Sequence, residues 1–473
     1  MLTRRAVLGS LFKGAGWLAL RSAASAEDRT RIVLRRGTIA PVPIPDDFIG
    51  LGYEMSSVSA PGLLGAANSK YVALVNGLGA RGVIRVGGIV ADYTRFDAKG
   101  TAAWDPHHTV INEASLRQFA EFLDATGWRA IWSLNFAQGT LDDAVTEARA
   151  VNAALGEHLI AFELGNEVEN YPRGAHAFRP PGWDYAAFRR QYSAWRAAIV
   201  KALPKARFAA PDTASSVEWV ENMARDADGE VQLLTTHYYR EYQKRGSAEQ
   251  LLTPDPRLAD VLARLRIASQ QSHIPWRMCE TNSFSGGGLP GVSDTLIGAL
   301  WTLDFLLLLA AAGCSGVNIE TGVNQLGFLS YYSPIRNDSS GAPSAGNPYY
   351  GMLAFAEARR GCTHMLPIEA DLGGVNATAY ALGASGALHS VVVVNRERAR
   401  EAAVDLSRIF LRDAHVLRLT ARSTESTAQV TLGGASVDAA GRWSPVSTEK
   451  LRAGIVIVPA MSAAVALAAR SRP

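Results

Sequence analysis

Cysteine is scarce in this sequence, and the spacing of the few that occur excludes two ways of stabilising a fold. Only Cys279, Cys314 and Cys362 are present among 473 residues, and no two of them form a CxxC pair. Zinc ribbons use closely spaced cysteine pairs, and disulfide frameworks use many cysteines in a short chain. We therefore expect neither a structural zinc site nor a disulfide scaffold, and the odd number leaves one thiol unpaired.

Charge is also sparse and nearly balanced. Charged residues make up 19% of the chain, the net charge is +3, and no block of Lys or Arg alternates with aromatic residues. Nucleic-acid-binding proteins display such basic stretches, so nucleic acid is not an expected partner. The hydrophobic content of 48% supports a large core, and the length predicts one large and one smaller domain.

The sequence lacks a long uninterrupted apolar run. The most apolar stretch, Leu303–Ala312, is interrupted by Asp304 and ends at Gly313. A membrane-spanning helix needs about 20 apolar residues, so this stretch is predicted to be a buried helix of a soluble domain.

The N-terminus has the composition of a targeting segment. Thr3-Arg4-Arg5 precedes a modestly apolar run that contains Lys13, and Ala24-Ser25-Ala26 offers a small-residue cleavage site. Residues 1–26 are interpreted as a twin-arginine-like signal peptide. The mature protein is then expected to be periplasmic or secreted, with no stable membrane span once the signal is removed.

Short apolar segments alternate with amphipathic helical ones over most of the chain. The predicted strands are Phe48–Tyr53, Val83–Gly87, Ala130–Asn135, Leu159–Glu167, Phe208–Thr213, Leu233–Tyr239, Arg277–Thr281 and Val317–Glu320. Eight strand-then-helix units predict a (β/α)8 TIM barrel over residues 47–365. Residues 366–473 change to short alternating strands with Gly, Asn and Ser turns, which predicts an all-β sandwich. Residues 27–46, a short strand and a Pro-rich link, are expected to join that sandwich.

Active sites of such barrels lie at the C-terminal ends of the strands. The polar residues there are Glu54, Arg85, Asn135, Asn166, Glu167, Asp212, His237, Tyr238, Glu280 and Glu320. Glu167 and Glu280 stand on the fourth and seventh strands, whose ends face each other across the mouth. In the fourth strand a two-residue period places Glu163, Gly165 and Glu167 on one face.

Two facing glutamates suit two kinds of chemistry. Retaining glycosidases hold their carboxyl groups about 5–5.5 Å apart, one as nucleophile and one as acid/base, and inverting enzymes hold them about 6.5–9.5 Å apart. A pair of glutamates at a barrel mouth suits a divalent cation equally well. These residues alone leave both readings open.

The motifs around Glu167 and Glu280 resemble those of a known family. Leu164-Gly165-Asn166-Glu167 followed by Cys279-Glu280-Thr281 resembles clan A of the retaining glycoside hydrolases. The stretch from Glu280 to Pro290, Glu-Thr-Asn-Ser-Phe-Ser-Gly-Gly-Gly-Leu-Pro, is similar to the nucleophile region of family 79, which contains heparanases and β-glucuronidases. Arg85-Val86-Gly87-Gly88 and His237-Tyr238-Tyr239 are similar to that family too, and the resemblance covers residues 47–360.

The resemblance implies a role for each matching residue. Glu280 is the nucleophile, kept ionised by Arg85, and Glu167 is the acid/base. Asn166 is expected to bind the sugar 2-hydroxyl, with His237 and Tyr238 beside the two carboxylates. Glu54 is expected to bind another sugar hydroxyl.

The resemblance also implies a clamp for the C6 carboxylate of a uronic acid. The clamp uses the backbone N–H groups of Gly286 and Gly287 and a tyrosine hydroxyl after the eighth strand. Phe328 stands where a tyrosine might be wanted, so Tyr331 is the first choice for this hydroxyl and Tyr332 the second.

The implied function is a retaining, exo-acting β-glucuronidase. Heparanase-like members carry Thr-Lys after the second strand to contact sulfate, whereas this chain has Ile89-Val90. The expected substrate is a β-glucuronide in an oligosaccharide, polysaccharide or glycoconjugate, and no metal or organic cofactor is implied. The alternatives are an endo-β-glucuronidase, a clan A hydrolase of a neutral sugar, and a non-catalytic carbohydrate-binding protein.

Overall fold

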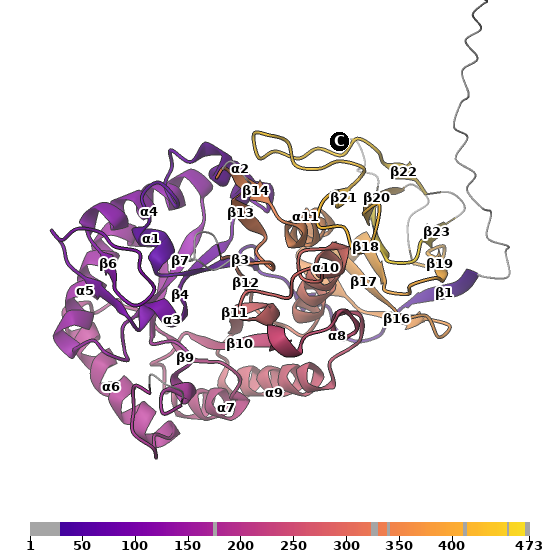
Figure 1. Ribbon diagram of the computed structural model, residues 1–473. Coiled ribbons are helices and arrows are strands. Elements are labelled where there is room, and N and C mark those ends of the chain that lie inside the picture. The colour runs from indigo at the N-terminus through magenta and orange to yellow at the C-terminus, as the bar shows by residue number, and fades with distance from the viewer. Residues whose placement is uncertain are drawn as a thin grey trace, which may run out of the picture.

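We describe a computed structural model of the chain, which covers residues 29–173, 177–322, 330–337, 341–409, 414–451 and 454–468. The predicted signal peptide, residues 1–26, lies outside these residues. Two units stand side by side, a barrel ringed by helices and a smaller part made of strands (Figure 1).

The eight predicted strands form one parallel sheet that curls into a barrel. In chain order they are β3 (Ile49–Glu54), β4 (Val83–Gly87), β7 (Arg129–Leu134), β8 (Leu159–Leu164), β9 (Ala209–Thr213), β10 (Leu233–Tyr242), β11 (Trp276–Ser285) and β12 (Val317–Glu320). The sheet order is β8-β7-β4-β3-β12-β11-β10-β9. A parallel bridge between Phe162 and Phe208 joins the two ends, supported by a 2.9 Å hydrogen bond from the Phe162 N–H to the Arg207 carbonyl. The predicted TIM barrel is confirmed.

Helices follow every barrel strand. The main ones are α2 (Ser69–Gly77), α4 (Glu113–Thr126), α5 (Leu141–Leu155), α6 (Tyr185–Ala202), α7 (Val217–Asp226), α9 (Pro256–Ser272), α10 (Leu296–Ala311) and α11 (Asn347–Arg359). Short helices are α1 (Ser56–Ser59), α3 (Gly88–Ala91) and α8 (Ala248–Leu252), and short strands are β5 (Thr94–Phe96), β6 (Thr109–Ile111), β13 (Ile335–Asn337) and β14 (Pro343–Ala345).

Local sequence signals set the limits of these helices. The Asn112 side chain accepts the Ser115 N–H at the start of α4, and Gly127 ends that helix with a left-handed φ of 69°. At the start of α5, Thr140 and Asp143 form a capping box. The apolar stretch around Leu303 lies in α10 and is buried on nearly all sides, as predicted. Within the described residues no helix is both long and apolar enough to cross a membrane.

The smaller unit consists of two sheets, and the N-terminal strand belongs to it, as the fold prediction stated. Its strands are β1 (Arg29–Arg36), β2 (Val42–Pro43), β15 (His364–Leu366), β16 (Ile368–Asp371), β17 (Ala377–Ala384), β18 (Ala387–Asn395), β19 (Glu401–Asp405), β20 (Ala414–Thr420), β21 (Thr431–Leu432), β22 (Glu449–Lys450), β23 (Ile455–Val458) and β24 (Ser462–Ala468). One sheet has the order β16-β1-β19-β23 and the other β2-β15-β17-β18-β24-β20-β21. The indigo β1 lies among orange and yellow strands in Figure 1.

The larger of these sheets is buried on both faces. Val391 and Val393 of β18 belong to the core between the two sheets, whereas Val392 and Val394 belong to the core shared with the barrel. The two-residue period of a strand produces this division, because successive side chains point to opposite faces. The smaller unit is therefore packed directly on the barrel helices.

A buried polar cluster also joins the two units. Asp304 of α10 accepts a 2.9 Å hydrogen bond from the Tyr380 hydroxyl of β17, and it pairs with Arg396 and Thr378. Arg396 is 6% exposed. A cation that is buried to this extent needs a carboxylate partner.

We expect Asp304→Ala to lower the free energy of unfolding by about 3 kcal/mol, because it leaves the buried Arg396 without its anion. Chemical denaturation and the melting temperature measure this loss. The matched control is Asp260→Ala, whose side chain is 70% exposed in its pair with Arg264, and which should change stability by less than about 0.5 kcal/mol. Equal effects of the two variants would contradict a stabilising role for the Asp304–Arg396 pair between the barrel and the β unit.

Candidate active site

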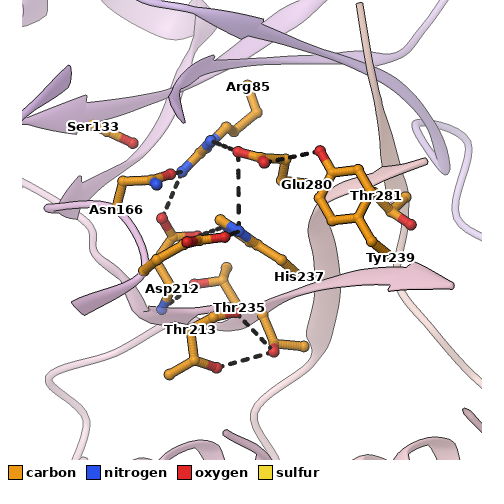
Figure 2. A network of polar contacts seen from close by, with 12 residues as sticks. Arg85, Ser133, Asn166, Asp212, Thr213, Thr235, His237, Tyr239, Glu280 and Thr281 are labelled. Carbon is orange, nitrogen blue, oxygen red and sulfur yellow. Dashed lines mark hydrogen bonds and ion pairs between the residues drawn. The ribbon is translucent and has the colours of Figure 1, made fainter. Parts of the chain in front are cut away.

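Polar side chains converge at the C-terminal ends of the barrel strands around one arginine. Arg85 of β4 is fully buried, and its guanidinium donates to the carboxylates of Glu163, Asp212 and Glu280 at 2.9, 2.5 and 2.8 Å. It also donates to the Asn166 side-chain oxygen at 2.9 Å. Figure 2 shows Arg85 pointing at Glu280 and Asn166, with Asp212 and His237 below them.

Two hydrogen-bond donors set the position of the residue predicted to be the nucleophile. One oxygen of Glu280 accepts from Arg85 at 2.8 Å, and the other accepts from the Tyr239 hydroxyl at 2.9 Å. A carboxylate that accepts from a guanidinium forms a strong, charge-assisted hydrogen bond. Both oxygens of Glu280 are thus held in place.

His237 lies between the two predicted catalytic carboxylates. Its Nε2 is 2.8 Å from Asp212, and its Nδ1 is 3.4 Å from Glu167 and 3.9 Å from Glu280. Burial alone would lower the pKa of His237, but Asp212 and Glu280 outweigh it and raise that pKa well above its usual value. The same contacts with Arg85 and His237 lower the pKa of Asp212 despite its burial. The raised pKa favours the charged imidazole, whose shortest contact is with Asp212.

Glu167 and Glu280 are close enough to act on one bond. Single oxygen atoms of the two carboxylates lie within 4.8 Å of each other and of a His237 nitrogen. Two carboxylates this close can reach the same glycosidic bond, one as nucleophile and one as acid/base.

The strand prediction for the fourth unit is wrong at its end. Strand β8 stops at Leu164, Gly165 has φ of 84°, and Glu167 has a left-handed φ of 49°. Glu163 points into the buried ion cluster, and Glu167 stands on the turn beyond it. The two-residue period therefore does not extend to Glu167. A left-handed conformation is costly for a glutamate, and such strain gathers at functional sites.

The two carboxylates open into a pocket of about 510 Å³. Its lining includes the predicted residues Glu54, Asn166, Glu167, Glu280, Gly286 and Gly287, together with Ile89, Val90, Tyr239, Glu320 and Tyr332. Arg85 and His237 lie behind the lining of the pocket, where each of them contacts Glu280.

Tyr238 lies elsewhere, contrary to the prediction. Its hydroxyl donates to Asp255 at 2.7 Å, and its ring stacks on Phe305 of α10 at 5.4 Å. Successive residues of β10 point to opposite faces, so His237 and Tyr239 face the barrel interior and Tyr238 faces the helices. Tyr239 is the residue that contacts Glu280. The alternation along the strand could have identified it.

The same one-residue correction applies after the eighth strand. Tyr332 is buried and lines the pocket, whereas Tyr331 is half-buried and is not among the lining residues. The N–H groups of both tyrosines donate to the Gly287 carbonyl, at 2.6 Å for Tyr331 and 3.3 Å for Tyr332. These bonds join the loop to the glycine turn. Residues 323–329, including Phe328, lie outside the described chain.

The glycine turn beside Glu280 has a backbone that only glycine adopts easily. Gly286, Gly287 and Gly288 have φ of 82°, 95° and 86°. A Cβ on Gly286 would come within 2.8 Å of the Tyr242 ring. The Gly288 N–H donates to the Phe284 carbonyl. The turn thus brings two backbone amides to the wall of the pocket.

The pKa values of two further carboxyl groups in the pocket are raised. Burial, and after it the charge of Glu280, raise the pKa of Glu54 to about 8. Glu54 accepts the Val90 N–H at 2.9 Å. Burial, Glu280 and Glu54 raise the pKa of Glu320 well above its usual value. Both shifts favour the neutral forms, which reduce the negative charge of the pocket.

Protein stability should therefore fall as the pH rises from about 5 to 8. In the unfolded chain Glu54 titrates near 4.5, so its favourable protonation in the fold is fully present below that pH and is lost as the pH approaches 8. His237 acts in the same direction above pH 6.5. Melting temperatures across this range should decline less steeply for Glu54→Gln than for the parent chain. The exposed Glu121→Gln variant is the control and should keep the parent slope.

Comparison with known proteins agrees with a carbohydrate-cleaving site. No family model matches the chain. A β-glucuronidase of Aspergillus niger is 24% identical over 399 residues, covering 75% of this chain and 72% of the relative. A β-glucuronidase of Neurospora crassa is 26% identical over 363 residues, covering 66% and 63%.

Solved structures share the fold. A 4-O-α-L-rhamnosyl-β-D-glucuronidase of Fusarium oxysporum, in complex with Rha-GlcA, matches with a TM-score of 0.76 at 18% identity, over 93% of this chain and 100% of that one. A family 51 α-L-arabinofuranosidase of Bifidobacterium longum matches with a TM-score of 0.65 at 13% identity, over 92% and 99%. Together with the paired carboxylates at the barrel mouth, the relatives show that this chain is a glycoside hydrolase, so the non-catalytic alternative is wrong.

Proposed function

We propose that this glycoside hydrolase is a retaining, exo-acting β-glucuronidase of family 79. The observation that carries the proposal is Glu280, held in place by hydrogen bonds from Arg85 and Tyr239, with a Glu167 oxygen within 4.8 Å and a glycine turn beside both. The curated relatives named β-glucuronidase support the substrate class. The signal-like N-terminus adds the proposal that the enzyme acts in the periplasm or outside the cell.

The reaction proceeds in two displacements. A Glu280 oxygen forms a bond to the anomeric carbon while the glycosidic bond breaks, and Glu167 gives its proton to the leaving oxygen. Glu167 then takes a proton from water, whose oxygen attacks the anomeric carbon and releases Glu280. Arg85 holds Asn166 by its side-chain oxygen, which leaves the amide nitrogen to donate to the sugar 2-hydroxyl. Two inversions restore the β configuration.

The glycine turn supplies recognition of the uronate. Gly286 and Gly287 line the pocket wall, and in the described part of the chain no backbone carbonyl accepts the N–H of either glycine. The Tyr332 hydroxyl is the neighbouring donor, so it takes the role first assigned to Tyr331. The protons held on Glu54 and Glu320 keep the pocket from repelling the substrate's carboxylate.

Activity on a panel of 4-nitrophenyl β-glycosides tests the substrate. The kcat/KM for the glucuronide should exceed that for the glucoside and the xyloside by at least about 100-fold, because a neutral sugar leaves the clamp donors unpaired. Tyr332→Phe should reduce activity on the glucuronide, whereas the neighbouring Tyr331→Phe is the matched control. Faster cleavage of a neutral glycoside would support the clan A alternative and reject the glucuronidase.

Two further measurements test the mechanism and the mode of action. Proton NMR of the first product should show β-glucuronate before mutarotation, and the α anomer would mean that Glu167 and Glu280 are misassigned. A polymeric substrate should release small sugars from its end with little loss of chain length. A rapid fall in chain length would favour the endo-acting alternative.

A further inference from the structure

A second cavity lies beside the catalytic pocket, and the catalytic steps above do not use it. It has a volume of about 580 Å³ and is lined by residues of β5, of β6, of the loop after β7 and of the start of α5. Its lining includes Tyr93, Arg95, His107, His108, Asn135 and Gln138. His107 lines the catalytic pocket as well. The two hollows are therefore neighbours that share one wall.

An aromatic ring in this cavity is held in a fixed orientation. The Tyr93 ring meets the His107 ring edge-on at 5.0 Å with an interplanar angle of 90°, and it meets Phe178 at 5.4 Å and 64°. Tyr93 is half-buried. A rigid aromatic side chain gives contact area at a low entropic cost. Such rings suit the apolar face of a pyranose.

The polar part of the wall is equally well fixed. Gln138 donates from its side chain to the Asp92 carbonyl at 2.9 Å, and Asn135 donates to the Thr94 carbonyl at 2.7 Å. The Asn135 oxygen accepts the N–H groups of Gln138 and Gly139. These bonds tie the loop after β7 to the segment after α3 (Gly88–Ala91), so the wall is formed before any ligand arrives.

The chemistry of the lining fits a hydroxyl-rich ligand. Arg95 and Asp143 bring charges of both signs, so the cavity does not require an ionised group. Imidazoles, amides and a phenol offer donors and acceptors around the Tyr93 ring. A polar cavity of this size with one ordered ring is unlike a site for an apolar aglycone.

We infer that this cavity is a second sugar-binding subsite, which holds the sugar residue attached to the glucuronate in the catalytic pocket. The inference rests on the proposed glucuronidase function. The attached sugar is either a substituent on the glucuronate ring or the first sugar of the leaving group, and both present the same hydroxyl-rich surface. The enzyme then prefers a glycosylated glucuronide over a simple aryl glucuronide.

Three substrates test the inference with variants on the cavity wall. They are 4-nitrophenyl β-glucuronide, the same compound with a neutral sugar on O4 of the glucuronate, and a glucuronosyl-galactose disaccharide. Tyr93→Ala and His108→Ala should lower kcat/KM by about tenfold for one of the two extended substrates, and by less than about twofold for the simple glucuronide. Trp104→Ala is the matched control, since this exposed aromatic on the same connection is absent from the lining of either cavity.

Each outcome has a defined meaning. A loss confined to the O4-glycosylated compound places the substituent in the cavity, and a loss confined to the disaccharide places the leaving sugar there. Equal losses on all three substrates, or no loss on either extended one, would overturn the inference. His108, whose side chain is 88% exposed, is the variant that keeps the test valid if Tyr93→Ala fails to fold. Absence of parent activity on every glucuronide would instead reject the proposed function.

Discussion

Replacing Glu280 with Gln is expected to lower kcat on a β-glucuronide by about 10⁴-fold or more, because an amide cannot form the covalent glycosyl intermediate. The variant should remain folded, since the Gln oxygen can accept from Arg85 and the Gln amide nitrogen can donate to the Tyr239 oxygen. Binding of free glucuronate should change little, as the nucleophile acts mainly in the transition state. Steady-state kinetics and calorimetric titration measure the two quantities separately.

The control for this variant is Glu121→Gln, an exposed substitution on α4. It should keep the parent kcat. A Glu280→Gln enzyme with more than about one hundredth of the parent kcat would assign the nucleophile elsewhere, given the size of the effects that follow loss of a covalent catalyst. Loss of glucuronate binding with normal folding would give Glu280 a binding role in place of a chemical one.

Replacing Arg85 with Met is expected to cost about 3–5 kcal/mol of stability as well as most of the activity. The fully buried guanidinium is the shared partner of Glu163, Asp212 and Glu280. Removing it leaves His237 as the remaining cationic partner of Asp212 and Glu280, and it leaves Glu163 without its ion-pair partner, so the carboxyl groups must take up protons or separate. We expect a much lower melting temperature. We also expect lower activity at neutral pH, because carboxyl groups that lose this cation hold their protons to a higher pH.

Two further variants serve as controls for this prediction. Arg264→Met breaks a half-buried surface pair that makes two hydrogen bonds to Glu221, and it should cost about 1 kcal/mol. Arg85→Lys keeps the charge but offers a single nitrogen in place of a planar fork, so it should recover part of the stability and little of the activity. An Arg85→Met protein as stable as the parent would show that the cluster does not depend on this cation.

Much of the fold was predictable from local patterns. The predicted strands Val83–Gly87 and Val317–Glu320 have the same first and last residues as β4 and β12. Short buried strands are easy to predict because they appear in the sequence as compact apolar runs between turn residues. The alternation in the smaller unit identified strands that face two different cores. The carboxylates were predictable as well, since active sites of barrels lie at strand ends.

Two tyrosine positions in the site differ from the prediction. Tyr331 was chosen ahead of Tyr332 in a loop, whose conformation no strand period sets, and Tyr238 was predicted in place of Tyr239 on a strand. Barrel strands are buried on both faces, so apolar and aromatic residues occur on each, and composition does not say which face a given residue takes. Strand pairing and bulges decide this, and β10 contains such an irregularity between Thr236 and His237.

Local residue patterns were sufficient to predict a (β/α)8 barrel with an attached β unit and the two glutamates at its mouth, because periodicity and the order of elements can be read along the chain. The other features of the site arise from the folding of distant segments against each other. This folding brings Arg85 within hydrogen-bond distance of carboxylates 78, 127 and 195 residues away, and it places His237 between Glu167 and Glu280. It also sets the second cavity beside the first. These are contacts between distant segments, and they depend on the closure of the barrel and on loop conformations that no local pattern encodes.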